Sequence, residues 1–293
     1  CVLICIAAFR VVMTGVTYYF YYVHLSIFGH PSYVSMYTSL SFYLTLYFLF
    51  KNKKNLSLEY RLALYVVMGI LMIGVLILRS KAGILAFGVM FIIWVVYLLN
   101  NNKRRIGWST AFLAGCIALC VIGMTTDLLP MNRFKESMTE FQERKQMPYG
   151  TGSSQVRLTV WKSAWEVTRD NLPWGAGTGD AMDELCVHAV KKNYTNLIGH
   201  HYNCHDQYLQ SMLTTGIPGL ITVLMFCFYP VVVSIRKKDI VYLTFAIIII
   251  LNMLVESMFE VRAGVDFIAL MNIILFLRCR LKNEEKEGLG IRD

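Results

Sequence analysis

Eight long apolar segments dominate the chain and leave it few ways to fold. Each is long enough to cross a hydrocarbon core about 30 Å thick as a helix, and the 293-residue chain is 56% hydrophobic. The segments lie near residues 2–23, 33–50, 60–78, 83–100, 109–126, 212–235, 240–257 and 264–279. Because backbone polar groups need partners inside a bilayer, the pattern predicts an all-α polytopic membrane protein.

Basic residues cluster in connections that all fall on one side of the alternating spans. The clusters are Lys51, Lys53, Lys54 and Arg61; Lys103, Arg104 and Arg105; Arg236, Lys237 and Lys238; and Arg278, Arg280, Lys282, Lys286 and Arg292. Cytoplasmic connections carry the excess of Lys and Arg, so these clusters and both termini are expected to be cytoplasmic. The formal net charge of +9 therefore indicates topology and not nucleic-acid binding.

This alternation divides the chain into four parts. We expect N-terminal transmembrane helices in 1–126, a large external loop in 127–205, C-terminal transmembrane helices in 206–280 and a cytoplasmic tail in 281–293. The first residue is Cys1 rather than Met, and the ordered regions of a signal peptide are lacking. Further spans are therefore expected before this residue, and a cleaved signal peptide is the alternative that we do not favour.

The external loop contains a predicted helix from Ser153 to Asp170. Its apolar face is expected to consist of Leu158, Trp161, Trp165 and Thr168, which recur at helical spacing. Ser153 or Ser154 is a candidate N-cap.

A glycine-rich turn, Pro173-Trp174-Gly175-Ala176-Gly177-Thr178-Gly179, follows this helix. It lacks the spacing and the preceding strand of a dinucleotide site. Two interpretations remain: a plain helix stop, or a turn whose backbone approaches a glycan or a phosphate. The tryptophans Trp161, Trp165 and Trp174 either anchor the loop at the membrane surface, which we favour, or stack on sugar rings.

Two cysteines in the loop, and three histidines near its end, suggest a disulfide or a metal site. Cys186 and Cys204 would pair only if they lie close together in an oxidising compartment. His200, His201, Cys204 and His205 have metal-ligand chemistry, but a zinc site needs tetrahedral convergence, which adjacent loop histidines do not guarantee. We expect neither a metal nor another cofactor.

Three cations lie at the predicted external surface. Arg79 and Lys81 occupy the tip of a tight helical hairpin, where they either contact lipid headgroups or clamp a pyrophosphate. Arg157 lies near the start of the loop helix, where a positive charge opposes the helix dipole. A nearby anion or a surface ion pair would explain its position.

The external end of the seventh span carries Glu256, Glu260 and Arg262. The two glutamates are expected to share a helix face at i,i+4 spacing, where their charges repel unless a cation intervenes. Arg262 is the expected cation. Supporting a catalytic histidine or binding an acceptor is the functional alternative.

His205 is the strongest catalytic candidate in the sequence. It ends the loop just before a membrane-entering helix, and imidazole titrates near neutrality and can take a proton from a hydroxyl. Asp206 follows it, and nine residues separate Asp206 from Gly216-Ile217-Pro218-Gly219.

Together these motifs resemble the bacterial O-antigen ligases and O-antigen polymerases, membrane glycosyltransferases of the GT-C type. The likeness rests on His205 with the spaced Gly216-x-x-Gly219, on Arg157-x-x-x-Trp161 followed by Pro173-x-Gly175-x-Gly177, and on the Arg79-Ser80-Lys81 hairpin. It covers roughly residues 30–275. Asp206 stands where the family has Asn, Ser or Gln, and Lys81 stands where it has Arg.

The resemblance implies transfer of a glycan from an undecaprenyl-pyrophosphate donor to a hydroxyl of lipid A-core or a similar acceptor. The reaction would occur at the periplasmic face of the bacterial inner membrane, as a step of lipopolysaccharide and cell-envelope biosynthesis, without metal or nucleotide. The implied roles are donor binding for Arg157, Arg79 and Lys81, acceptor activation for His205, and support from Asp206, Glu256, Glu260 and Arg262.

Two other functions remain open. A polysaccharide polymerase uses the same donor and differs in its acceptor. A polysaccharide transporter or lipid flippase belongs to another class, and such proteins are expected to show internal repeats, broken spans or charges near the bilayer midplane. The external charges here cluster at the interface or in the loop, which favours an enzyme.

Overall fold

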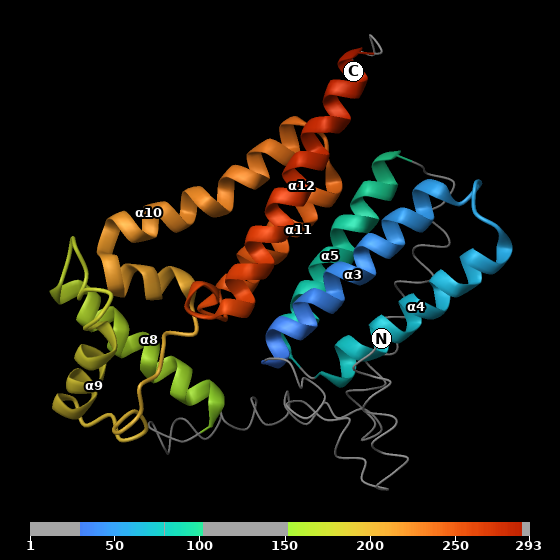
Figure 1. Cartoon of the computed structure of the whole chain (residues 1–293). Helices are drawn as coiled ribbons and strands as arrows, with labels where there is room; N and C mark the ends of the chain where they lie inside the picture. Colours follow the sequence, from blue (N-terminus) through green and yellow to red (C-terminus); the bar gives the residue numbers. More distant parts are fainter. Residues whose placement is uncertain (1–29, 79, 102–151, 289–293) are drawn as a thin grey trace, which may run out of the picture. The chain divides into compact units, whose positions relative to one another are not determined.

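The computed structural model describes residues 30–78, 80–101 and 152–288, and every regular element within them is a helix (Figure 1). The spans expected near 2–23 and 109–126 lie outside the described residues. The chain divides into two compact units, residues 1–132 with 238–248 and residues 133–237 with 249–293.

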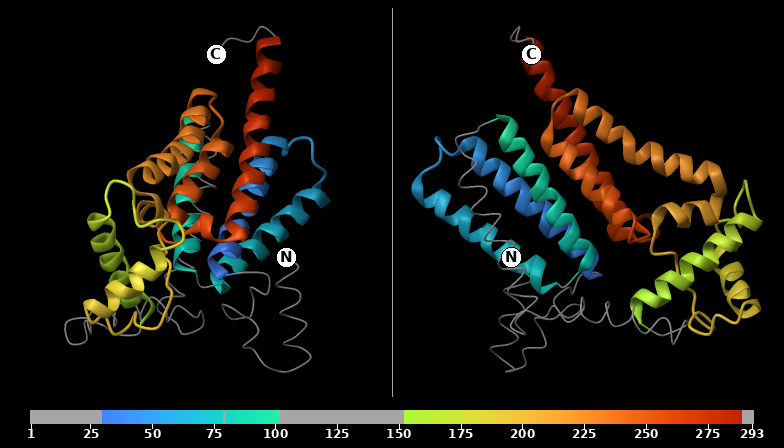
Figure 2. Two further views of the ribbon diagram at one scale, coloured as in Figure 1. Left: turned by 60° about the vertical axis from the view of Figure 1, so that its left-hand side comes forward. Right: turned by 180° about the vertical axis from the view of Figure 1, so that it is seen from behind.

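In the first unit, three helices lie side by side: α3 (Pro31–Asn52), α4 (Leu58–Ile77) and α5 (Lys81–Asn101) (Figures 1 and 2). Aromatic side chains fill the contact between α3 and α5, where the rings of Tyr43 and Trp94 meet edge to face with centroids 6.0 Å apart. Gly83 permits the close approach, because a side chain there would overlap Ser35 of α3.

The tight hairpin expected between α4 and α5 is confirmed. The first helix ends at Ile77 and the next begins at Lys81, and the Ser80 hydroxyl accepts a hydrogen bond from the Gly83 N–H at 3.1 Å. Such a bond satisfies one of the free amides at a helix start. Arg79 lies outside the described residues, and for Lys81 only the backbone position is described.

Within the described residues, three helices are long and apolar enough to span a membrane: Leu58–Ile77, Ala82–Leu99 and Gln207–Arg236. This supports a helical membrane protein but not the expected count of about eight spans. The apolar helix α11 (Ile240–Met253) has 14 residues, or roughly 21 Å at about 1.5 Å per residue. Serine, threonine and tyrosine recur along α3, and charges flank the apolar part of α12 (Arg262–Gly288). Neither helix is therefore among the three candidate spans.

The second unit holds the helices α8 (Ser153–Asp170) and α9 (Ala181–Lys191), the long helix α10 (Gln207–Arg236), the end of α11, the short helix η3 (Met258–Glu260), and α12. A core of apolar residues joins α8, α9 and the start of α10. It consists of Val160, Ala164, Val167, Ala181, Leu185, Ala189, Tyr194, Leu197, Cys204 and Leu213.

The helix predicted from Ser153 to Asp170 is confirmed as α8. Its predicted apolar face is correct at Thr168, which is buried, but wrong at Trp165, and the predicted serine cap is wrong. The side chains of Val160, Ser163 and Ala164 are fully buried, whereas Trp165 is 53% exposed. Small and β-branched side chains let α9 pack closely, which bulky indoles would prevent. The N-cap is Gly152, without a side-chain hydrogen bond.

Helix α10 is bent at Gly216, whose φ of 69° and ψ of −148° are not helical (Figure 2). The Pro173–Gly177 turn packs into this bend. Ile217 donates a backbone hydrogen bond to the Pro173 carbonyl at 2.9 Å, and Ala176 and Gly177 donate to the two carbonyls before the bend, Leu213 and Thr214. A Cβ on Gly216 would overlap the Pro173 carbonyl.

The glycine-rich turn is therefore a docking element for α10. The N–H groups of Gly175, Ala176 and Gly177 donate to the carbonyls of Asn171, Leu213 and Thr214. Since these amides are occupied, they are not available to a phosphate or a glycan. The interpretation of the turn as a backbone anion site is thus wrong for these three amides.

Candidate functional site

His205 lies in the short segment between α9 and α10 and has an unusual backbone conformation. Its φ is 46°, in the left-handed region that most side chains avoid, although histidine enters it more often than most. The Asn203 side chain accepts a hydrogen bond from the His205 N–H at 3.1 Å. Asp206 ends the segment by capping α10, since its carboxylate accepts from the Leu209 N–H at 2.9 Å.

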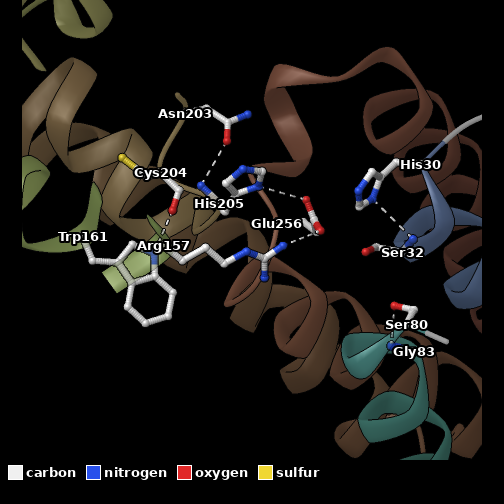
Figure 3. Close-up of polar contacts among 10 residues, drawn as sticks. All are labelled: His30, Ser32, Ser80, Gly83, Arg157, Trp161, Asn203, Cys204, His205 and Glu256. Carbon is white, nitrogen blue, oxygen red and sulfur yellow. Dashed lines mark hydrogen bonds and ion pairs between the residues drawn. The ribbon is translucent and has the colours of Figure 1, made fainter. Parts of the chain in front are cut away.

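Glu256 joins His205 and Arg157 through its two carboxylate oxygens (Figure 3). The Arg157 guanidinium lies 3.3 Å from Oε1, and the His205 Nδ1 lies 3.5 Å from Oε2. The three residues come from α8, from the end of the loop and from the bend after α11. Residues separated by up to 99 positions thus meet at one carboxylate.

Burial differs sharply among the three side chains. Glu256 is 8% exposed, whereas Arg157 is 29% and His205 is 30% exposed. A buried carboxylate is costly unless it is paired, and Arg157 and His205 are the two partners of Glu256. His205 Nδ1 is buried and makes no hydrogen bond to a described residue, and its 3.5 Å contact with Glu256 is an ion pair only when the imidazole is protonated. Such contacts are often long before substrate binds.

Two of the expected supporting residues do not join this cluster. Because α11 ends at Met253, Glu256 and Glu260 do not share a helix face, and that prediction is wrong. Arg262 is 93% exposed and pairs with Asp266 on its own helix at 3.1 Å, so it is not the cation between the glutamates. The cation at Glu256 is Arg157.

Asp206 contributes to the site through the backbone. Its carboxylate caps α10, and burial raises its pKa, while backbone hydrogen bonds from Leu209 and Tyr208 act in the opposite direction. The cap fixes the start of α10 at Gln207, two residues after His205.

The other loop histidines lie apart from the carboxylate. His201 is 68% exposed and faces Asp183 at 3.7 Å, and the Cys186 thiol donates to the His200 carbonyl at 3.2 Å. Cys186 and the buried Cys204 are both free thiols. No group of three metal-ligating side chains converges in residues 30–78, 80–101 and 152–288.

Sequence reasoning missed the polar contacts that hold the His205 segment. The Trp161 indole N–H donates to the Cys204 carbonyl at 2.7 Å, so neither membrane anchoring nor sugar stacking describes this end of the ring. The Gln210 side chain accepts from the Cys204 N–H at 2.9 Å, and the Gln207 side chain accepts from the Phe259 N–H at 2.7 Å. The signal available in the sequence is the pair of side-chain amides, Gln207 and Gln210, at the start of an apolar helix. Buried amides need hydrogen-bond partners, so these two indicate polar contacts at this point.

A second polar cluster joins α8 to α9. The Ser163 hydroxyl lies 2.8 Å from His188 Nδ1, and the other ring nitrogen lies 3.2 Å from Glu166. Burial lowers the pKa of His188, and Glu166 opposes this shift. Ser163 is fully buried, so the trio joins two helices and offers no accessible nucleophile.

The fold and the Glu256 cluster define a helical membrane protein with a charged site where its loop meets a candidate span. The family model described as O-antigen ligase matches residues 64–224, which is more than half of the chain, and the chain belongs to this family. Its members are membrane glycosyltransferase-like ligases and polymerases that use glycan and lipid substrates. A search of curated proteins finds no match.

Proposed function

We propose that the protein is a ligase that transfers a glycan from undecaprenyl pyrophosphate to a hydroxyl of lipid A-core or a similar acceptor. The observation that carries this proposal is the contact of Glu256 with both His205 and Arg157. It brings a titratable base and a cation to one buried carboxylate at the entrance of a candidate span.

In this reaction the acceptor hydroxyl oxygen attacks the anomeric carbon of the donor sugar. The bond between that carbon and the pyrophosphate oxygen breaks, and undecaprenyl pyrophosphate leaves with the electron pair. His205 takes the hydroxyl proton, in keeping with general-base catalysis by imidazole. Because its Nδ1 is buried towards Glu256, Nε2 is the nitrogen that we assign to the acceptor.

Glu256 then acts as the carboxylate of a catalytic triad does. It fixes the orientation of the imidazole and stabilises the imidazolium formed by proton transfer. Its other oxygen holds Arg157, whose guanidinium has five donors and so has donors left for the departing pyrophosphate. Fixed cations stabilise the charge that develops on a leaving phosphate.

We also assign Arg79 and Lys81 to donor binding, on the ground that two cations at a predicted external hairpin suit a pyrophosphate. Arg79→Ala and Lys81→Ala should each raise KM for the donor. Normal transfer by both variants would make the hairpin a headgroup anchor.

The direct test uses purified protein in lipid vesicles with an undecaprenyl-pyrophosphate-linked glycan and lipid A-core. We expect glycosylated acceptor and released undecaprenyl pyrophosphate in equal amounts, unaffected by EDTA. A ladder of lengthened lipid-linked glycans would favour the polymerase. Movement of the donor across the bilayer without bond cleavage would favour a flippase, and loss of activity with EDTA that zinc restores would favour a metal enzyme.

A further inference from the structure

Both backbone polar groups of Cys204, the residue before His205, are hydrogen-bonded to side chains. The Cys204 carbonyl accepts from the Trp161 indole at 2.7 Å (Figure 3), and the Cys204 N–H donates to the Gln210 side chain at 2.9 Å. Cys204 is fully buried and Gln210 is 1% exposed. Loss of either partner would leave a buried backbone polar group of Cys204 unsatisfied.

These bonds fix a residue whose backbone needs support. His205 has a φ of 46°, and conformations of this kind persist where the surroundings determine them. The residue before it is held by α8 and α10 at once. A change in the Cys204 carbonyl would rotate the His205 ring relative to Glu256, because φ of His205 is the only freely rotating backbone dihedral between that carbonyl and the His205 side chain.

Helix α8 reaches the site twice from one face. Arg157 and Trp161 are four residues apart, so their side chains lie one turn above the other. Arg157 contacts Glu256, and Trp161 contacts the carbonyl before His205. The same helix thus contacts Glu256 directly and holds the residue before His205.

We propose that Trp161 is a positioning residue that, together with Gln210, holds His205 in its left-handed conformation with Nδ1 towards Glu256. This inference rests on the proposed role of His205 in the transfer reaction. Trp161 acts through its indole N–H and the Cys204 carbonyl.

The first test is Trp161→Phe, which keeps an aromatic ring and removes the N–H donor. Misplacement of a catalytic group by about 1 Å costs up to roughly 10²-fold, so kcat should fall by about 10- to 10²-fold while KM for the donor stays unchanged. The matched control is Trp165→Phe on the same helix, at a side chain that is 53% exposed, and it should keep full activity. Thermal melting of each variant gives the fraction of folded protein, and kcat is calculated per folded molecule.

The second test separates positioning from a general structural role. In a His205→Asn background, Trp161→Phe should lower the remaining kcat no further, because coupled residues are not additive. An equal fall in both backgrounds, or a Trp161→Phe enzyme with normal kcat, overturns the positioning role while leaving His205 in place. A fully active His205→Asn enzyme removes the proposed function of His205, and the role of Trp161 falls with it.

Discussion

At the scale of single residues, the central feature is one buried carboxylate shared by two partners. Glu256 is 8% exposed and contacts Arg157 and His205 at 3.3 and 3.5 Å. Removing one partner from a buried charge pair leaves the other uncompensated. Arg157 therefore has two functions in our proposal, since it neutralises Glu256 and presents its remaining donors to the pyrophosphate.

Arg157→Ala should reduce transfer by about 10²-fold or more, the cost of removing one donor that stabilises a developing anion. Arg157→Lys should recover part of the activity, because lysine keeps the charge but loses the planar fork. The assay is steady-state transfer from the lipid-linked donor at matched amounts of folded protein.

The control for this prediction is Arg169→Ala. Arg169 lies on the same helix, is 65% exposed and pairs with the neighbouring Asp170, so its loss should leave transfer unchanged. Full activity of Arg157→Ala would remove this arginine from the site.

At the scale of elements, the sequence predicts local structure better than it predicts contacts between distant residues. The α4–α5 hairpin and the bounds of α8 follow from apolar periodicity, and both are present in the structure. The contact of Arg157 with Glu256 joins residues 99 positions apart, which no local spacing encodes. Glu256 was placed on a helix because apolar residues continue past Met253, whereas the helix ends there.

The bend in α10 depends on the absence of a side chain at Gly216. Gly216→Ala should lower the melting temperature, because its backbone conformation suits glycine and costs other residues about 1–3 kcal/mol, and because the added methyl would overlap the Pro173 carbonyl. Gly69→Ala in α4 is the matched control, since the space around Gly69 is open and alanine favours a helix by about 0.5–1 kcal/mol. Equal melting temperatures for the two variants would contradict docking of the turn at this bend.

The α8–α9 contact should weaken at acidic pH. Burial lowers the pKa of His188, so the folded state binds a proton less readily than the unfolded state. This stabilisation is present above the ordinary histidine pKa of about 6.5 and is lost as the pH falls through the lowered folded value. His188→Gln should therefore melt with a smaller difference between pH 7.5 and pH 5 than the parent protein. If the difference in melting temperature between the two pH values is the same in His188→Gln and in the parent protein, His188 is not the source of the pH dependence.

At the scale of the whole molecule, the site contacts bear on topology. The predicted alternation places His205 and the end of the seventh span on the same side of the membrane, and His205 contacts Glu256. Trp165 and Trp174 are 53% and 74% exposed, and anchoring at the membrane surface by these two tryptophans stays a prediction. Which side carries the loop is predicted from the basic clusters.

Labelling of introduced cysteines in intact cells tests this orientation. A membrane-impermeant thiol reagent should label Lys191→Cys, at the exposed end of α9, above the parent background. Lys237→Cys, in an expected cytoplasmic cluster, should be labelled only after lysis. The reverse pattern would place the loop in the cytoplasm and contradict both the topology and a periplasmic reaction.

The most direct measurement of the central claim is the turnover of His205→Ala in vesicles supplied with the lipid-linked donor and the acceptor. General-base assistance contributes about 10²–10⁴-fold, so this variant should lose nearly all transfer. His200→Ala and His201→Ala, whose side chains lie apart from Glu256, should remain close to the parent enzyme. A His205→Ala enzyme that transfers glycan as fast as the parent would contradict the assignment of His205 as the base.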